Sequence, residues 1–175
     1  MTKTLTCIAL LLAAVGCAGP SPKSAARPPI DACDLLTLDE ADPQGANALS
    51  PVGNAVDQSV GADVAKCSYG TVDLPVRVVS VEVRRFRDAS AAQSAQRSAR
   101  GMLRSLAGEE PQAVEGLGED AAWAGGRLCQ LHAQSGDIRL IVTVEVGDEA
   151  GREARAREIA VRALARLAAP PKKAA

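Results

Sequence analysis

Residues 138–146 read Ile-Arg-Leu-Ile-Val-Thr-Val-Glu-Val, and this stretch does most to decide the fold. Apolar side chains stand at 138, 140, 142, 144 and 146, whereas Arg139, Thr143 and Glu145 are polar. Successive side chains of a β-strand point to opposite faces of its sheet, so the alternation predicts a strand with one buried face. Residues 76–86 alternate in the same way, with valine at 79, 81 and 83. The chain is therefore expected to build an amphipathic sheet.

Two long helices are expected beside these strands. Asp88 caps a helix that runs to about Leu106, and Asp148 caps a final helix. A short acidic side chain is favoured at these positions because it accepts hydrogen bonds from the free amides of the first turn. Small and apolar residues recur at helical spacing in both segments, which predicts that each helix packs one face against the sheet.

The remaining strands complete the expected fold. Short strands are predicted at 67–71, 121–124 and 128–134, and Gly136-Asp137 fits a hairpin turn into the strand at 138–146. Short hairpin links favour antiparallel pairing. We therefore predict an α+β fold: a two-layer sandwich in which a mostly antiparallel sheet of about five strands carries two long amphipathic helices on one face.

The segment before the first strand gives weaker signals. Asp31 to Leu36 can form a short helical turn, and Thr37 and Glu40 match a capping box for a second one, which Pro43 ends early. Residues 44–66 are rich in Gly, Asn, Ser and Asp and predict a long irregular loop. Such a loop is either functional or a tolerated surface insertion.

The first 16 residues have the composition of a secretory signal peptide. Lys3 precedes an apolar run of roughly 11 residues at 5–15, well short of the ~20 that span a bilayer. Residues 14–17, Ala-Val-Gly-Cys, resemble the bacterial lipobox, with alanine where leucine is usual. We expect Cys17 to be acylated and to become the mature N-terminus, which would hold the protein extracytoplasmically at the cell envelope. Plain cleavage would instead release a soluble secreted protein.

A tether and one domain are expected after the anchor. Residues 18–30 contain four prolines and no periodicity, which is typical of an extended spacer. We divide the chain into a signal peptide at 1–16, the lipidated cysteine and tether at 17–30, a single α+β domain at 31–168 and a disordered tail at 169–175. Ala18, in place of aspartate after the cysteine, matches sorting to the outer membrane if the host is Gram-negative.

Composition excludes several classes of function. Removal of residues 1–16 takes only Lys3 from the 20 basic and 21 acidic side chains, which leaves 19 and 21. No basic block is present, so nucleic acid is not an expected partner. Phe86, Tyr69 and Trp123 are the only aromatic residues. Stacking on sugars or on single-stranded nucleic acid is therefore disfavoured.

Three cysteines remain after Cys17, at positions 33, 67 and 129. Export favours a disulfide, and Cys33 and Cys67 lie at the edges of predicted elements, so we expect these two to pair. Closing that loop of about 34 residues would stabilise the fold by ~4 kcal/mol in the chain-entropy model. Cys129 is expected to be a buried free thiol. A redox or nucleophilic role for it lacks a nearby base or a C-x-x-C partner.

Three short motifs follow one another in the domain: Asp-Ala-Cys-Asp-Leu-Leu-Thr at 31–37, Cys-Ser-Tyr at 67–69 and Gly-Leu-Gly-Glu-Asp-Ala-Ala-Trp at 116–123. This set, over residues 31–168, resembles a family of small bacterial lipoproteins of unknown function that is common in actinobacteria. The resemblance implies an α+β fold and pairing of the first two cysteines of the domain. It implies no reaction, cofactor or catalytic residue. Pro43 departs from the helix that the family has after its Leu-Leu-Thr segment.

Few residues qualify as a site. Glu115, Glu119 and Asp120 form an acidic run near Trp123 that could support acid–base chemistry, although solvated loop charge is the better explanation of the run. Tyr69 and Trp123 are possible interaction residues, the best anchors of the chain if exposed and core residues if buried.

Two further motifs have structural explanations. His132, the only histidine, is expected at the surface or at a sheet edge, and alone it makes a poor zinc site. Gly116-Leu117-Gly118 lacks the third glycine and the Lys-Ser/Thr of a phosphate loop, so it fits a tight turn. The sequence thus gives no catalytic, metal or cofactor residues.

These features favour a membrane-anchored lipoprotein that acts as a binding or interaction module in the cell envelope, without evident catalysis. Its expected partners are the membrane, through the lipid anchor, and an envelope protein or apolar ligand. Two alternatives remain open. One is an envelope hydrolase or lyase that uses the acidic residues near Trp123, and the other is an accessory subunit of an envelope complex.

Overall fold

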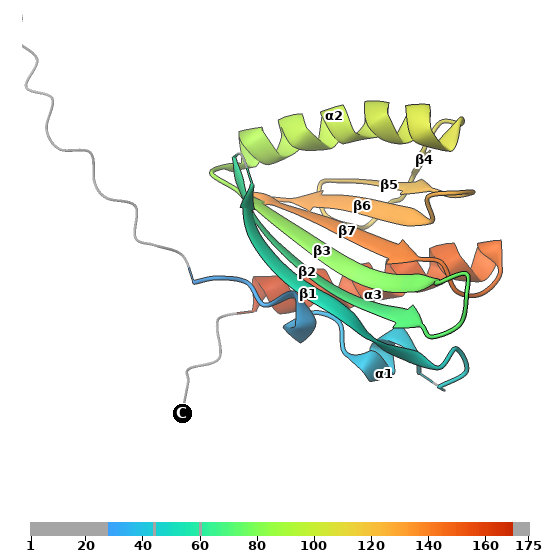
Figure 1. The fold of residues 1–175 in the computed structure, drawn as a ribbon. Coiled ribbons are helices and arrows are strands. Elements are labelled where there is room, and N and C mark those ends of the chain that lie inside the picture. The colour runs from blue at the N-terminus through green and yellow to red at the C-terminus, as the bar shows by residue number, and fades with distance from the viewer. Residues whose placement is uncertain (1–27, 44, 60, 170–175) are drawn as a thin grey trace, which may run out of the picture.

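Seven antiparallel strands form one sheet in the part of the chain that the computed structural model describes, residues 28–43, 45–59 and 61–169 (Figure 1). Their order across the sheet is β1-β2-β3-β7-β6-β5-β4. The strands are β1 (Leu49–Ser59), β2 (Ala62–Thr71), β3 (Val78–Phe86), β4 (Gln112–Ala113), β5 (Asp120–Ala124), β6 (Gln130–Ser135) and β7 (Ile138–Val144). The helices are η1 (Ala32–Asp34), α1 (Leu38–Ala41), α2 (Ala89–Ala107) and α3 (Glu149–Ala168). The α+β class and the antiparallel pairing are confirmed.

The signal peptide at 1–16, Cys17, most of the tether and the tail from residue 170 lie outside the described residues. Within the described ranges, none of the helices combines the length and the apolar character that crossing a bilayer requires.

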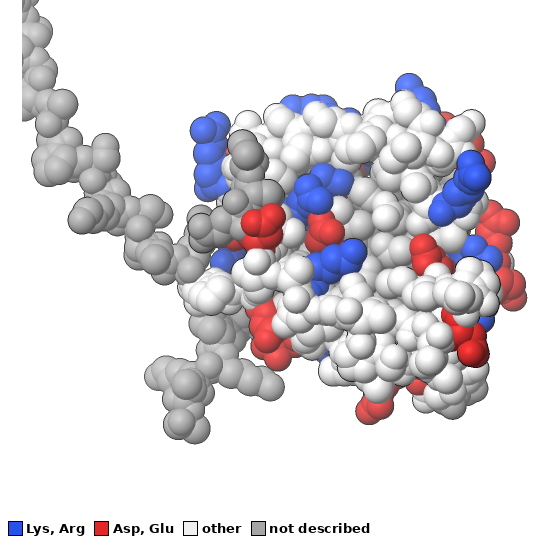
Figure 2. Space-filling view, viewed as in Figure 1, with Lys and Arg blue, Asp and Glu red and all other residues white. Residues whose placement is uncertain are grey.

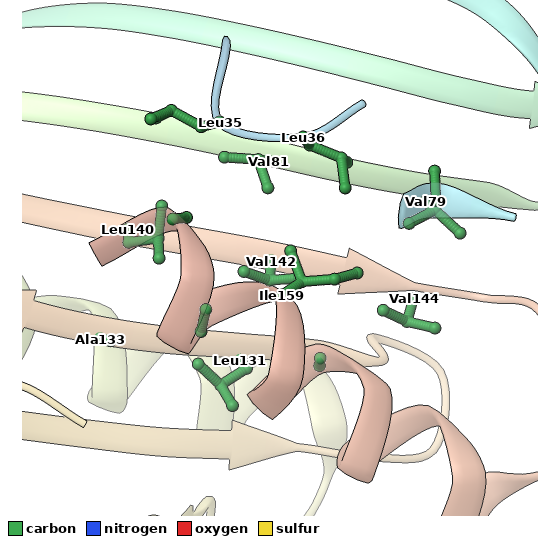
Figure 3. Packing of buried hydrophobic residues seen from close by; sticks show 14 of the residues in the cluster. Leu35, Leu36, Val79, Val81, Leu131, Ala133, Leu140, Val142, Val144 and Ile159 are labelled. Carbon is green, nitrogen blue, oxygen red and sulfur yellow. The ribbon is translucent and has the colours of Figure 1, made fainter. Parts of the chain in front are cut away.

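The central strands follow the predicted alternation. β3 pairs with β7 so that Val79, Val81 and Val83 lie opposite Val144, Val142 and Leu140, and all six side chains are fully buried. Ile159 and Ala160 of α3 pack against this apolar face (Figure 3). The burial of branched side chains here is the main source of stability, at about 25 cal/mol per Å² of apolar surface.

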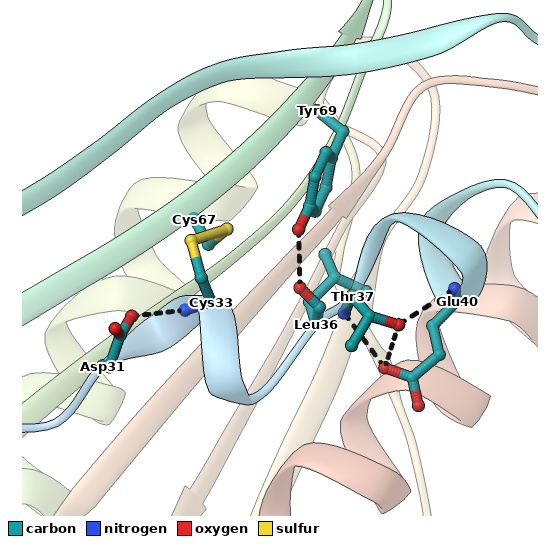
Figure 4. Close-up of a disulfide and its surroundings, with 7 residues drawn as sticks. All are labelled: Asp31, Cys33, Leu36, Thr37, Glu40, Cys67 and Tyr69. Carbon is teal, nitrogen blue, oxygen red and sulfur yellow. Dashed lines mark hydrogen bonds between the residues drawn. A yellow bond between two sulfur atoms is a disulfide. The ribbon is translucent and has the colours of Figure 1, made fainter.

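The N-terminal segment closes the β2–β3 end of this core. Leu35 and Leu36 are buried in the same cluster, and the Tyr69 hydroxyl donates to the Leu36 carbonyl at 3.0 Å (Figure 4). The predicted disulfide joins Cys33 to Cys67, with Cα atoms 5.1 Å apart. The segment is thus held to β2 by a covalent bond and a buried hydrogen bond.

The predicted capping box begins α1. The Thr37 hydroxyl accepts from the Glu40 amide, and the Glu40 carboxylate accepts from the Thr37 amide (Figure 4). Arg166 of α3 also donates to that carboxylate, at 2.8 Å. This contact ties the short helix to the final one.

The prediction of an irregular loop at 44–66 is wrong. β1 and β2 form a long hairpin there, with Leu49 opposite Thr71 at one end and Ser59 opposite Ala62 at the other. β1 is an edge strand whose residues 51–57 are all exposed, so no alternation of buried and exposed positions marks its sequence. Pro51 and Gly53 flank a register shift, as is usual at a sheet edge. The sheet therefore exceeds the five strands expected.

The two-layer arrangement with both long helices on one face is also wrong. α3 covers the face that presents Val81 and Leu140, whereas α2 lies over the opposite face, with Ala99 and Leu103 above Ile141 (Figure 1). The sequence did not predict that a helix covers the second face of the sheet, because that face carries mostly polar or small side chains. Helix α2 meets it mostly through residues that are themselves small or polar: Ala92, Gln96 and Ala99 are buried, and Leu103 is the large apolar residue among the buried positions of this helix.

Candidate functional site

A hollow of about 220 Å³ lies between α2 and the polar face of the sheet. Its floor comes from alternate residues of β2, β3, β6 and β7, and its wall comes from the second half of α2. The floor is polar because strand alternation sends the valines of β3 to the α3 side and Ser80, Glu82 and Arg84 to this side. Figure 2 shows charged side chains of both signs gathered at the centre of the face below α2. We call this site the basic hollow.

The sheet register assembles the charges of the basic hollow. Arg84 of β3 lies directly opposite Arg139 of β7, and Lys66 of β2 lies opposite Glu82 of β3. Glu82 forms an ion pair with Arg84, with Nε and Oε1 2.6 Å apart. Three cations, Lys66, Arg84 and Arg139, therefore line the hollow beside one carboxylate, that of Glu82. The hollow is locally positive although the formal net charge of the chain is −1. Like charges placed opposite each other on neighbouring strands are destabilising unless something compensates them.

Arg139 is the buried cation of the site. Its exposed fraction is 7%, and among the described residues no carboxylate lies within ion-pair distance of it. Its Nη2 donates to Nδ1 of His132 at 2.9 Å, while its buried Nε has no hydrogen-bond partner in the described part of the chain. Burial and the neighbouring charge of Arg84 lower the pKa of Arg139 to about 10, so it keeps its charge at neutral pH.

His132 holds the Arg139 guanidinium in place. Because arginine only donates, His132 Nδ1 must accept, and Nε2 then carries the proton and donates to Oε1 of Gln130 at 3.1 Å. Burial first, and then the charges of Arg139 and Arg84, lower the pKa of His132 to about 3. The ring is therefore neutral at physiological pH. The prediction of a surface or edge histidine is wrong, because α2 covers this face and leaves the residue 4% exposed.

The helix wall of the basic hollow is apolar. Leu103 is buried, whereas Met102 and Leu106 line the hollow and are each 59% exposed. Large apolar side chains on a helix are normally turned into the core, so two of them at the rim of a cavity leave an apolar surface open to a ligand. A second hollow, of about 330 Å³, adjoins along β1 and β2 and shares Lys66 with the first.

The predicted interaction residues are elsewhere. Tyr69 and Trp123 are 7% and 4% exposed and belong to the core on the α3 side of the sheet. The condition under which they would serve as surface anchors is not met. Trp123 lies opposite Leu131 on β6 and helps to pack the sheet against α3.

Glu115, Glu119 and Asp120 of the acidic run line one hollow of about 260 Å³ together with Arg100, but two of their three carboxylates are already bound by neighbouring groups. Glu119 accepts from the Gly136 amide at 2.9 Å and from the Gln134 side chain at 3.0 Å, Asp120 pairs with Arg100, and Glu115 is exposed. The hydrogen bonds from Gly136 and Gln134 lower the pKa of Glu119, so it stays ionised.

Gly118 and Cys129 have structural roles. Gly118 has φ +63°, and a Cβ there would lie 2.2 Å from the Gln134 carbonyl oxygen, so only glycine fits this turn. Cys129 is a buried free thiol, as predicted, and Arg152 donates to its sulfur at 3.0 Å.

The residues of the basic hollow were missed at the sequence level. Lys66, Arg84 and Arg139 lie on three strands, and nothing in their local sequence relates them. The available signal was that Arg139 and the lone His132 fall on the polar side of strands whose neighbours are apolar.

No family model, curated protein or solved structure matches the chain.

Proposed function

We propose that the protein is a binding module of the cell envelope, held at the membrane through acyl chains on Cys17, and that it takes a small ligand in the basic hollow beneath α2. The observation that carries the proposal is the combination of a cavity, a buried cation with no direct ion pair among the described residues, and an exposed apolar wall. Ligand sites are typically concave and mostly apolar, with a few fixed polar groups that orient the ligand. Arg139, locked by His132, fits that role.

The proposed binding module does not require a catalytic reaction. Catalysis by the carboxylates near Trp123 has less support, because Glu119 and Asp120 are already engaged by neighbouring groups. An accessory subunit of an envelope complex would need a surface for a protein, and no such partner is indicated by the hollow itself.

The test is native mass spectrometry of the full-length protein extracted from envelopes in mild detergent. The wild-type protein is expected to carry a small-molecule adduct. Replacing both Met102 and Leu106 with Glu places two carboxylates on the apolar wall and should remove the adduct, and both positions are exposed enough for the fold to tolerate the change.

Val161→Glu is the matched control. Val161 is 50% exposed but lies on α3, on the other side of the sheet. It should retain the adduct. An adduct absent from the wild-type protein, or equally present in the Met102/Leu106 variant, would contradict binding in the basic hollow.

A further inference from the structure

We infer that the ligand of the basic hollow is a single-chain anionic amphiphile, a carboxylic acid whose head binds Arg139 and whose apolar tail lies along Met102, Leu103 and Leu106. This inference rests on the proposed function and specifies the ligand class. Three observations support it: Arg139 as the site for the charged head, the apolar α2 wall as the site for the tail, and the size of the cavity.

The head site is a buried cation that forms no direct ion pair with the described residues. Arg139 is more than nine-tenths buried, faces Arg84 across the strand pair, and has no ion-pair partner among the described residues. A buried charge is normally paired, since an unpaired one is strongly unfavourable. A bound anion would supply the missing pair.

The donors available suit a carboxylate. Backbone amides of β3, β6 and β7 are engaged in the sheet ladder, so an anion in the hollow must be held by side chains. Arg139 lines the hollow and its buried Nε has no partner in the described part of the chain, and a planar guanidinium matches the planar carboxylate. Lys66 and Arg84 add positive charge to the lining of the hollow, while Glu82 limits the excess there to two charges.

The tail site is the α2 wall. Met102 and Leu106 are exposed at the edge of the same cavity whose floor holds Arg139. A volume of about 220 Å³ is below the ~300 Å³ at which drug-sized pockets begin, so it holds a head and the first part of a chain but not a two-chain lipid. The rest of a single chain would cover the exposed wall.

The test measures binding by titration calorimetry, with the exported full chain carrying Cys17→Ala so that no detergent is needed. The probes are dodecanoate, dodecanol and acetate, each below its aggregation limit, and vesicles containing phosphatidylglycerol. Dodecanoate is expected to bind at least tenfold more tightly than dodecanol, which has the same chain without the charge, and than acetate, which lacks the chain.

Arg139→Gln should abolish the preference for dodecanoate over dodecanol. Arg97→Gln is the matched control, since it removes the same charge from an exposed position of α2 outside the hollow, and it should keep that preference. The Arg139 variant should unfold at no lower denaturant concentration than wild type, because it removes an unpaired buried charge, so lost binding would not reflect misfolding.

The other outcomes separate the two proposals. Equal binding of dodecanoate and dodecanol would overturn the anionic ligand while leaving a ligand-binding module. Equal binding of dodecanoate and acetate would overturn the tail site. Binding to vesicles without binding to dodecanoate would assign the hollow to a phospholipid headgroup and overturn the inference. If no probe binds, the inference fails, and the adduct measured by native mass spectrometry decides whether the proposed function survives.

Discussion

Mild acid should destabilise this protein through one side chain. His132 is the only histidine of the chain, and burial together with the charges of Arg139 and Arg84 lowers its pKa to about 3 in the folded state. In the unfolded chain its pKa returns to about 6.5. Below that value the unfolded state binds a proton that the native state excludes. Stability therefore falls as the pH drops from about 6.5 towards 3, and the loss is complete below the folded pKa.

The magnitude follows from the two pKa values. Between about pH 7.5 and about pH 5.5 the unfolded histidine gains nearly a full proton while the native one gains none, and the free energy of unfolding should fall by about 1.4 kcal/mol. One further pH unit should remove about another 1.3 kcal/mol. Carboxylates contribute little in the upper part of this range, because their ordinary pKa values are near 4.

Urea denaturation followed by the fluorescence of Trp123, the only tryptophan and 4% exposed, measures this change. His132→Asn keeps an oxygen that can accept from Arg139 but cannot titrate, so its stability should be flat between about pH 7.5 and about pH 5.5. Parallel pH profiles for the wild-type protein and this variant would refute a buried, neutral His132.

Glu40 should make the free energy of unfolding depend on pH in a separate, more acidic range. The hydrogen bond from Arg166 lowers its pKa to about 2, so its contribution is present above the ordinary carboxyl pKa and is lost as the pH falls from about 4.5 towards 2. Arg166→Ala should therefore lower stability at neutral pH by about 1 kcal/mol, reduced by solvent screening at this partly exposed pair, and should flatten the profile only below about pH 4.5.

Three further substitutions test the disulfide, the close approach at Gly118 and the proposed lipid anchor. Replacing Cys33 and Cys67 together with Ala should cost about 4 kcal/mol in urea denaturation, from a closed loop of 34 residues, and a loss under about 1 kcal/mol would contradict a structural disulfide. Gly118→Ala should cost about 2 kcal/mol more than Gly126→Ala, because both positions have positive φ but only the first meets a backbone oxygen; equal costs would show that the close approach is not rigid. Cys17→Ala should move the protein from the detergent phase to the aqueous phase in a partition assay, and unchanged partition would argue against acylation.

The sequence predicted those elements whose one buried face marks them locally. β3 and β7 were found because valines alternate with polar residues, and α2 and α3 because Asp88 and Asp148 cap amphipathic segments. The sequence did not predict β1 because both of its faces meet solvent over residues 51–57, where the strand is held mainly by backbone pairing with β2. Backbone pairing leaves no trace in side-chain periodicity.

The candidate site could not be predicted for a related reason. Its charges become neighbours through strand register, with Arg84 facing Arg139 and Lys66 facing Glu82, and register depends on pairing across β2, β3 and β7. In the sequence, a polar sheet face covered by a helix has the same alternation pattern as a polar face exposed to solvent. Only the position of α2 shows that His132 and Arg139 are buried.

The two faces of the sheet differ in a way that stability alone does not explain. The α3 side is packed with branched apolar side chains and closed by a disulfide. All buried side-chain polar atoms without a partner in the described residues lie on the other side, on α2 or on the strand face beneath it. They belong to Gln96, Arg100, Gln134 and Arg139. Apolar residues of similar size would hold α2 to the sheet at least as well, since each unsatisfied buried group costs about 1–3 kcal/mol. This unmet hydrogen-bonding capacity and charge on the α2 face is the basis for proposing that a ligand binds there.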